Sequence, residues 1–325
     1  MDRSQPMTPD QAAQAAARLE QAASEGNCDA AFLLAGWRLS GQFIPRDLSR
    51  ARAYYERAAE LGHDQAVMIA LSWQAGGTGG AADWPAAIAR LRDHAGANQQ
   101  AGSEVALIDK MDLTPDGFPT KPAVGETISE APLSRVFRGF ASEEECAYLI
   151  DFAEPRLQPA VVRYGAVSSE HVRHQVRTCH SMGFPLLGES PFIHAINRRI
   201  AAASDTDVRC GEPTQIFRYA VGEEFKPHVD SSSDFTNQRS WTFLVYLNDG
   251  YEGGETRFLS SGLEFKGRRG DALIFSNVDA AGKPDPASEH AGLPVAKGTK
   301  WLLSRWIRAN PIDFGEGAVR PRPFR

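Results

Sequence analysis

The chain has 325 residues, of which 42% are hydrophobic and 23% charged, ordinary values for a globular protein long enough for two domains. Its formal net charge is −6 and it has no long basic run, which argues against a nucleic-acid partner. The first ten residues are polar and no apolar run is long enough to cross a bilayer, so we expect no signal peptide and no membrane partner.

The four cysteines are scattered along the chain and form no C-x-x-C pair: Cys28, Cys146, Cys179 and Cys210. A disulfide framework or a cysteine-rich zinc site would need closer and more regular spacing. We therefore expect a reducing environment and a cytoplasmic location.

The segment from about Pro9 to Asn98 is rich in Ala, Leu, Glu and Arg, which favours helices. Thr8 precedes Pro9, a combination typical of a helix N-terminus. Two stretches in this segment align at a spacing of 36 residues, with Gly26 matching Gly62, and a weaker third copy begins at Leu91. Such a period, with paired helices, predicts an α-helical repeat domain.

The sequence of the second copy, around Tyr55-Glu-Arg-Ala-Ala-Glu-Leu-Gly, resembles Sel1-like repeats, which are related to tetratricopeptide repeats. The resemblance implies a concave surface for a protein partner. The alternative is a helical cap that packs on the rest of the protein and binds no partner.

Residues from about Asp112 to Ala131 contain three prolines and two glycines, which indicates an extended linker or an edge strand. A helix is expected after Ser142, and a second amphipathic helix over Phe192–Ala203. The remaining elements are short predicted strands separated by turns: 135–140, 214–219, 241–247, 255–259, 272–275 and 301–307. This pattern predicts an α+β protein in which helical repeats precede a jelly roll with flanking helices.

Three residues have the spacing of a metal site. His228 and Asp230 are two apart, so in a strand both side chains point to one face. His290 follows 60 residues after Asp230. Two imidazoles and one carboxylate with open positions form the facial triad of non-haem Fe(II) oxygenases. The same three ligands would also suit a zinc ion that activates water.

Lys300 begins a predicted strand in which Lys300, Leu302, Ser304 and Trp306 share one face. A lysine on the inner face needs an anion, because an unpaired buried charge costs about 3–5 kcal/mol. The distal carboxylate of 2-oxoglutarate would supply that anion. The alternative is a solvated lysine at the start of the strand.

The part of the chain from Arg135 to Arg308 resembles the prolyl 4-hydroxylase family of Fe(II)/2-oxoglutarate dioxygenases. The matching segments occur in the family's order: Phe140-Ala-Ser-Glu-Glu-Glu-Cys, Arg177-Thr-Cys, the stretch from Glu212 to Asp230, Arg239-Ser-Trp-Thr-Phe-Leu-Val-Tyr-Leu-Asn, Glu252-Gly-Gly-Glu-Thr-Arg-Phe, Gly270-Asp-Ala-Leu-Ile-Phe, and the stretch from His290 to Trp301. The family's R-T-S serine is replaced by Cys179, whose thiol is a weaker hydrogen-bonding group, so substrate choice can differ.

The resemblance implies iron ligands, co-substrate contacts and substrate contacts. The implied ligands of Fe(II) are His228, Asp230 and His290. The residues implied for 2-oxoglutarate are Lys300, Tyr219, Thr256 and Tyr246. The residues implied to face the substrate are Arg177, Glu212, Arg239 and Trp306. The tyrosines could instead be core aromatics, and the two arginines solvated surface residues.

These observations predict a helical repeat domain over 1–110, a linker over 111–132 and a double-stranded β-helix dioxygenase domain over 133–325. The resemblance implies hydroxylation of prolyl residues in a peptide or protein, using Fe(II), 2-oxoglutarate and O₂ with support from ascorbate, and yielding succinate and CO₂. Three alternatives stay open: a hydroxylase of another side chain or a free amino acid, a zinc hydrolase, and a scaffold with an inactive oxygenase domain.

Two further segments carry hypotheses. Residues 162–182 contain His171, His174 and His180, and we interpret this segment as a mobile lid rather than a second metal site. The basic tail 318–325 contains Pro321 and Pro323, and we expect it to be disordered; a more speculative hypothesis is that it imitates a prolyl substrate.

Overall fold

The computed structural model describes residues 7–160, 176–185 and 188–312. Its contacts group the chain into two units, one built from Met1–Phe118 with Leu187–Ile196 and the other from Pro119–Leu186 with Asn197–Ile312. No helix within the described ranges is both long and apolar enough to cross a membrane. The hypotheses for residues 161–175, including His171 and His174, and for the tail 318–325 lie outside the described residues.

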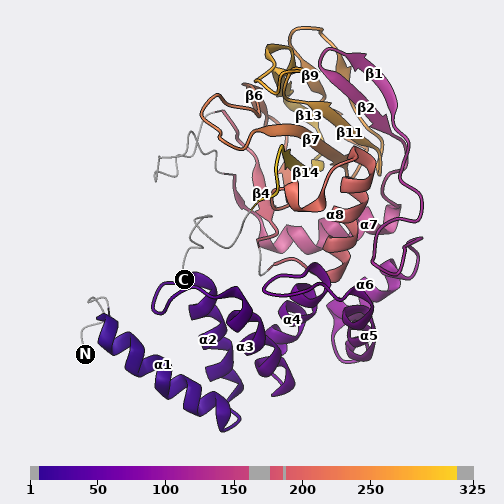
Figure 1. The fold of residues 1–325 in the computed structure, drawn as a ribbon. Helices are drawn as coiled ribbons and strands as arrows, with labels where there is room; N and C mark the ends of the chain where they lie inside the picture. Colours follow the sequence, from indigo (N-terminus) through magenta and orange to yellow (C-terminus); the bar gives the residue numbers. More distant parts are fainter. Residues whose placement is uncertain (1–6, 161–175, 186–187, 313–325) are drawn as a thin grey trace. The chain divides into compact units, whose positions relative to one another are not determined.

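The N-terminal unit is built from consecutive helices, each packed on the next (Figure 1). Their bounds are α1 (Pro9–Ser24), α2 (Cys28–Ser40), α3 (Leu48–Glu60), α4 (Asp64–Gly76), α5 (Trp84–His94) and α6 (Gln99–Ile108). Thr8 caps α1 through a capping box with Gln11, as its position before Pro9 predicts. The helical prediction for this part of the chain is therefore confirmed.

The sequence repeat is also a structural repeat. The even-numbered helices begin with an N-cap side chain at Asn27, His63 and Asn98, each accepting a hydrogen bond from the backbone N–H three residues on. Gly26 and Gly62, which precede the first two caps, have φ angles of 99° and 89°, a region that favours glycine. The 36-residue period thus corresponds to a repeated helix–turn–helix, while its assignment to Sel1-like repeats stays a prediction.

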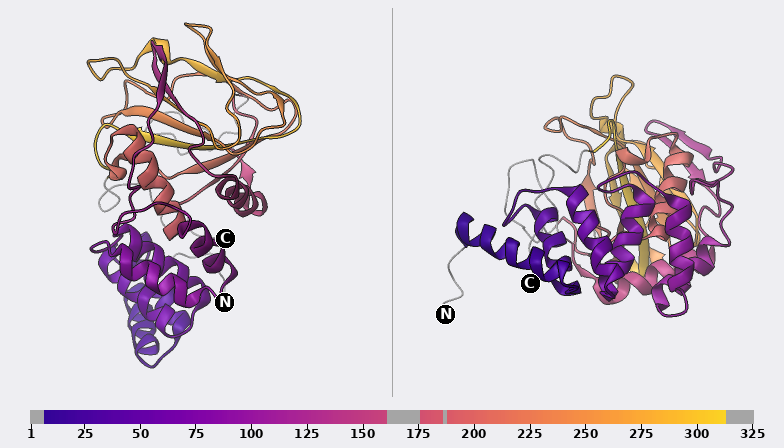
Figure 2. Two further views of the ribbon diagram at one scale, coloured as in Figure 1. Left: turned by 90° about the vertical axis from the view of Figure 1, so that its right-hand side faces the viewer. Right: turned by 60° about the horizontal axis from the view of Figure 1, so that its bottom comes forward.

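The second unit is built from antiparallel strands in three sheets, with the helix α7 (Glu143–Ala153) (Figures 1 and 2). The helix α8 (Pro191–Ser204) belongs to this unit from Asn197 onward. The large sheet has the order β1 (Glu126–Glu130), β2 (Leu133–Phe137), β11 (Ala272–Ser276), β7 (Arg239–Tyr246), β14 (Lys300–Arg308), β5 (Gln215–Tyr219), β4 (His180–Gly183) and β3 (Gln158–Pro159). The second sheet has the order β10 (Glu264–Phe265), β9 (Thr256–Phe258), β12 (His290–Gly292) and β6 (Phe225–His228). The third pairs β13 (Val295–Lys297) with β8 (Glu252–Gly253), and short 3₁₀ turns occur at Glu154–Arg156, Val208–Cys210 and Pro286–Ser288.

The core of this unit lies between the large and the second sheet. Leu244, Tyr246 and Leu302 come from the large sheet and pack against Phe258 and Phe265 of the second. Successive side chains of a strand point to opposite faces of the sheet. Each of these strands therefore directs one set of apolar side chains into this core and the alternate set to the other face of its sheet. Two facing antiparallel sheets around one core confirm the predicted α+β fold with a jelly-roll oxygenase domain.

Two local expectations concern short strands of the large sheet, and one of them is wrong. The stretch 111–132, expected to be an extended linker or an edge strand, contains the edge strand β1, because residues 126–130 pair with β2. The predicted lid 162–182 is wrong at its C-terminal end, where β4 pairs with β5 through His180 and Met182. At β4, backbone pairing with a strand more than thirty residues away outweighs the local composition.

An ion pair links α7 to α8 within the second unit. Glu145 lies in the first turn of α7, where it completes a capping box with Ser142. Its carboxylate also accepts two hydrogen bonds of 2.7 Å from Arg199, whose guanidinium additionally donates to the Phe140 carbonyl. The two side chains are 6% and 14% exposed, so neither charge can be satisfied by water alone.

Replacing Arg199 by methionine should therefore destabilise the protein by about 3 kcal/mol, because it leaves the Glu145 carboxylate buried and unpaired. Chemical denaturation monitored by circular dichroism measures the loss. The matched control is Arg257→Met, which breaks an exposed pair with Glu264 and should cost under about 1 kcal/mol. Equal losses in the two variants would contradict this assignment.

Candidate active site

The candidate metal ligands meet where β6 and β12 pair. His228 ends β6 and lies directly opposite His290, the first residue of β12, in the antiparallel register. Asp230 follows two residues after His228, as the H-x-D spacing predicts. One potential ligand atom from each of the three side chains lies within 4.8 Å of those of the other two. The structure thus brings together three residues that are 62 positions apart at their extremes.

Each of the three side chains is oriented by a second group. The Nδ1 atom of His228 lies 2.8 Å from the Lys226 carbonyl oxygen, and that of His290 lies 2.9 Å from the Ser288 carbonyl oxygen. Since a carbonyl only accepts, both Nδ1 atoms must carry the proton, which leaves both Nε2 atoms free to bind a metal. Asp230 accepts a 2.6 Å hydrogen bond from Thr242, which in turn accepts one from Asn277.

Burial and mutual proximity set the charges of the cluster. Burial, followed by the neighbouring His290, lowers the pKa of His228 to about 3. Burial alone would raise the pKa of Asp230, but His290 and His228, and then Arg239, hold it well below its usual range. At neutral pH the site therefore presents a neutral imidazole at His228 beside a carboxylate, the protonation states that a divalent cation requires.

This donor set fits a non-haem iron. It offers two imidazole nitrogens and one carboxylate from one side, which leaves the remaining coordination positions open. Among the described residues it is the only group of three or more His, Cys, Asp or Glu side chains with metal-ligand spacing. His180, the one described member of the predicted lid cluster, begins β4, and its Nδ1 lies 3.5 Å from a carboxylate oxygen of Glu223.

Lys300 lies on the wall of the same hollow, at the start of β14. The predicted strand face is confirmed, because Lys300, Leu302, Ser304 and Trp306 all line the hollow together with the three candidate ligands. Lys300 is 3% exposed, and its Nζ donates a 2.7 Å hydrogen bond to the Gly254 carbonyl. Burial lowers the pKa of Lys300 to about 8, although Glu255 partly offsets this effect. A buried ammonium group that forms no ion pair with a described carboxylate is suited to an anionic ligand.

The residues predicted to accompany Lys300 surround it. The rings of Tyr219 and Tyr246 have their centroids 5.4 and 5.6 Å from the Lys300 Nζ. The Tyr246 hydroxyl lies 2.9 Å from the Thr256 hydroxyl. Burial raises the pKa of both tyrosines, so both hydroxyls are protonated donors at neutral pH. An anion beside Lys300 would therefore find several hydroxyl groups within the same hollow.

The residues predicted to face the substrate fall into two groups. Arg177 and Trp306 line the hollow. The Arg177 guanidinium is stacked between the rings of Phe217 and Phe225, at 3.9 and 4.0 Å from their centroids. Glu212 and Arg239 do not line the hollow; they form a bidentate ion pair, and the Arg239 guanidinium lies 4.2 Å from the Trp306 ring centroid.

A β-bulge decides where Arg239 points. Strict alternation from Thr242, which faces the hollow, would turn Arg239 to the opposite face. The register shifts between β14 and β7, so that Ile307 pairs with Trp241 but Arg308 pairs with Arg239, which leaves Ser240 as an extra residue. The bulge returns Arg239 to the inner face beside Arg308. Arg308 is absent from our predicted site residues, although continuing the alternation past Trp306 by two positions would have found it.

Several buried polar atoms around the hollow have no hydrogen-bond partner among the described residues. They are Arg177 Nε, Trp306 Nε1 and the Tyr251 hydroxyl. Tyr251 and Trp306 belong to one apolar cluster with Tyr219 and Cys179, and Arg177 stacks on two rings of that cluster. Buried donors of this kind are costly unless a ligand or water satisfies them. The concentration of such atoms beside Lys300 fits a small polar co-substrate such as 2-oxoglutarate.

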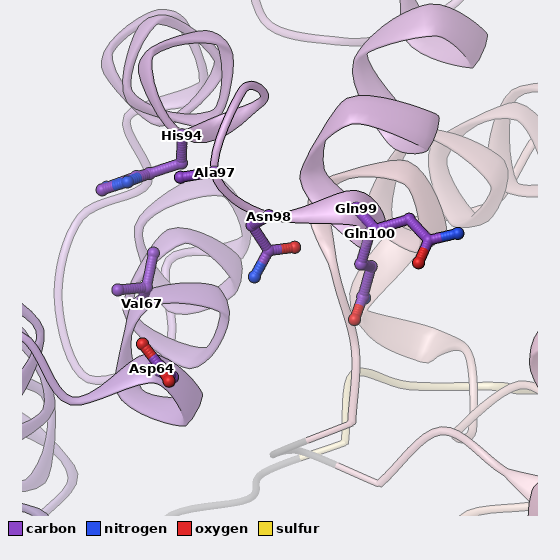
Figure 3. A pocket seen from close by; sticks show the side chains of 7 residues that line it. All are labelled: Asp64, Val67, His94, Ala97, Asn98, Gln99 and Gln100. Atoms are coloured by element: carbon purple, nitrogen blue, oxygen red, sulfur yellow. The ribbon is translucent and has the colours of Figure 1, made fainter.

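The helical unit contains a separate hollow of about 410 Å³ (Figure 3). Asp64 and Val67 of α4 form one wall, and residues of the α5–α6 turn, including Asn98, form the other. Its lining combines amides, one imidazole and one carboxylate without the ligand geometry of a metal site. We therefore place the chemistry of this protein in the jelly roll.

Loss of one imidazole should abolish metal binding. Mn²⁺, a redox-stable substitute for Fe²⁺, should stabilise the wild-type protein by about 2.7 kcal/mol at a concentration one hundred times its dissociation constant. His290→Ala should lose most of that stabilisation, whereas His94→Ala, in the helical unit, should retain it. Thermal denaturation with and without Mn²⁺ measures both, and full stabilisation of the His290 variant would rule out the triad as the metal site.

Known proteins share this site region in sequence. Residues 214–308, which hold the triad and Lys300, match the 2OG-Fe(II) oxygenase superfamily. Prolyl 4-hydroxylase 1 of Arabidopsis thaliana is 36% identical over 202 residues, which cover 56% of this chain and 71% of the relative. Probable prolyl 4-hydroxylase 10 of the same plant is 32% identical over 212 residues, covering 57% of this chain and 72% of the relative.

A solved structure also shows a likeness. The viral collagen prolyl hydroxylase of Paramecium bursaria Chlorella virus-1, in its 2OG complex, is 27% identical, with a TM-score of 0.44 over 55% of this chain and 96% of that one. The argument for the family rests on the sequence matches, which extend over more than two thirds of the plant relatives. Together with the triad and the buried lysine, they show that this chain belongs to the prolyl 4-hydroxylase family of 2-oxoglutarate- and Fe(II)-dependent dioxygenases.

Proposed function

We propose that this protein hydroxylates prolyl residues of a peptide or protein substrate, with 2-oxoglutarate and O₂ as co-substrates and succinate and CO₂ as co-products. The observation that carries the proposal is the meeting of His228, Asp230 and His290 with Lys300 in one hollow, in a member of this family. The buried ammonium group distinguishes a 2-oxoglutarate site from a hydrolytic zinc site, which needs only the metal and water.

The proposed roles follow from the positions of the side chains. His228, Asp230 and His290 hold Fe(II), and the hydrogen bonds to Lys226, Ser288 and Thr242 keep their ligand atoms directed at it. When bound, the iron with 2-oxoglutarate and O₂ supplies the oxidant that replaces a C–H hydrogen of the substrate by hydroxyl.

Lys300 pairs with the distal carboxylate of 2-oxoglutarate, and Tyr219, Tyr246 and Thr256 supply hydroxyl donors around it. This charge pair and these hydrogen bonds orient the co-substrate and offset the cost of burying its negative charge. The surrounding apolar side chains, such as Leu244 and Leu302, exclude water from the reacting centre.

The substrate is proposed to meet Arg177 and Trp306 in the hollow, with Arg239 and Glu212 behind Trp306. Trp306 offers an aromatic face and an indole N–H without a partner among the described residues. An aromatic face suits a proline ring, and a buried donor suits a peptide carbonyl.

The helical repeat unit is proposed to bind a protein partner or to act as a cap, and the domain limits 1–110, 111–132 and 133–325 stay predictions. A cytoplasmic location also stays a prediction. All four cysteines are free thiols in the structure.

The test is turnover of a peptide library whose members differ in whether they contain proline. With Fe²⁺, ascorbate and 2-oxoglutarate, mass spectrometry should find one added oxygen atom on proline, with one succinate formed for each. His228→Ala should lower this rate at least about a hundredfold, since a missing ligand removes the metal. Oxygen added only to proline-free peptides, or to free amino acids, would replace the proposed substrate by the alternative hydroxylase.

The pH dependence of 2-oxoglutarate binding tests the role of Lys300. Its pKa of about 8 means that Lys300 is charged below pH 8 and becomes neutral above it. The affinity for 2-oxoglutarate should therefore be nearly constant from pH 6.5 to 7.5 and should fall by up to about tenfold per unit above pH 8. Calorimetric titration of the Mn²⁺-loaded protein measures this affinity without turnover.

Lys300→Arg is the matched control, because a guanidinium stays charged throughout this range. It should bind 2-oxoglutarate more weakly, through altered geometry, but with a much flatter dependence on pH. The same decline above pH 8 in both proteins would show that another group titrates.

A further inference from the structure

Four side chains form an alternating stack of rings and guanidinium groups beyond Trp306, at the end of β14. We call Trp306, Arg239, Phe235 and Arg308 the arginine column. The Arg239 Cζ lies 4.2 Å from the Trp306 ring centroid and 5.7 Å from that of Phe235, and the Arg308 Cζ lies 4.7 Å from the Phe235 centroid. Because Trp306 lines the hollow, the column begins at the proposed active site and leads away from it.

The column is held in place by backbone and side-chain contacts. The bulge at Ser240 brings Arg239 beside Arg308 on the inner face. Arg308 Nη1 donates a 2.7 Å hydrogen bond to the Asn237 carbonyl, and the Asn237 side chain exchanges hydrogen bonds with the backbone of Asn310. The loop that carries Phe235 is therefore anchored to the end of β14.

The column has more positive than negative charge. Glu212 accepts from Arg239 Nε at 2.6 Å and Nη2 at 2.7 Å, and from Arg308 Nε at 2.6 Å. One carboxylate thus serves two guanidinium groups. Asp234, on the same loop, forms no ion pair with either arginine, and Asp230 is engaged by Thr242 and the two imidazoles. Burial lowers the pKa of Arg308, and the positive charge of Arg239 lowers it further, while Glu212 acts in the opposite direction. A lowered pKa is expected where positive charge is in excess.

Donor atoms of the column remain available to a ligand. Arg239 Nη1 and Arg308 Nη2 make no hydrogen bond to any described residue. Neither atom is among the fully buried atoms that lack a partner, so both are accessible from outside. The two arginine side chains are 22% and 18% exposed, so a ligand can reach them at a reduced dielectric. Two guanidinium groups with open donors beside an aromatic ring are suited to a carboxylate.

We propose that Arg239 and Arg308 bind a carboxylate of the substrate, so that the enzyme prefers a proline with an acidic group close by in the peptide. This inference rests on the proposed prolyl hydroxylation and specifies its substrate class. On β14, Arg308 lies two residues beyond Trp306, a distance of about 7 Å. An extended peptide advances about 3 Å per residue, which places the acidic group one to three residues from the hydroxylated proline.

Two sources can supply the carboxylate: an Asp or Glu side chain, or the chain terminus of a substrate that ends in proline. Two sets of peptide pairs separate them. The first set places Glu or Gln at one of the three positions on either side of an internal proline, which makes six pairs. The second set is one pair that ends in proline with a free or an amidated carboxylate. The carboxylate member of the preferred pair should show a kcat/KM about five- to tenfold higher than that of its neutral partner. This ratio should be smaller at 0.5 M salt than at 0.05 M.

Arg308→Gln should bring the ratio of the preferred pair close to one, a result that a purely structural role would not produce. The control is Arg257→Gln on β9, which removes an exposed charge of the same type and should leave the ratio unchanged. Thermal denaturation checks that both variants are folded. Equal kcat/KM for all pairs in the wild type, or an unchanged ratio in Arg308→Gln, overturns the proposal.

Binding of the same peptides to the Mn²⁺-loaded protein, followed by fluorescence anisotropy, separates this inference from the proposed function. A carboxylate preference in binding that Arg308→Gln removes supports the inference even if no peptide is hydroxylated, in which case the proposed function fails alone. If the peptides bind without any preference for a carboxylate while proline turnover is intact, the inference is wrong and the proposed function stands.

Discussion

The site depends on one backbone register, the pairing of β6 with β12 that sets His228 opposite His290. The two imidazoles face each other only because these strands are antiparallel neighbours in the second sheet. A slip of one residue would turn one imidazole to the opposite face of the sheet and dismantle the ligand set. Asp230 then needs only the two-residue spacing after His228 to join them. The hydrogen bond from Thr242 of the large sheet ties this carboxylate to the opposite wall.

Near the paired strands β6 and β12, the protein buries charged side chains whose hydrogen-bonding groups are only partly paired within the protein. Among the described residues, Lys300 donates a hydrogen bond only to the Gly254 backbone carbonyl, and Arg177 is held between two rings with its Nε unsatisfied. Such groups cost stability in the absence of a ligand, and the surrounding sheets must offset that cost. Arg177 and Trp306, which both carry such a donor, line the same hollow as the triad. The same principle extends to the arginine column, where two guanidinium groups share the Glu212 carboxylate.

The two units differ in what determines their elements: local sequence determines the helices, and pairing between distant segments determines some of the strands. The helices of the N-terminal unit follow from composition and from caps such as Asn27 and Asp47, all of which act within four residues. Strands such as β7 and β14 are recognisable by their β-branched and aromatic residues, and their alternation identified the face that carries Lys300. By contrast, β4 lies in a segment that we interpreted as a lid, because a short strand with few apolar residues is defined by its partners β5 and β3.

The sequence by itself determined the ligand types, the spacing of His228 and Asp230, the inward face of β14 and the resemblance that joins them, because these depend on residue chemistry and on the period of a strand. Only the tertiary structure decided that His290 lies opposite His228, that a bulge at Ser240 turns Arg239 to the inner face, and that Glu212 pairs with both Arg239 and Arg308. These features arise from contacts between strands far apart in the chain. A bulge changes which face a side chain occupies without any local signal, so alternation alone could not have placed Arg239.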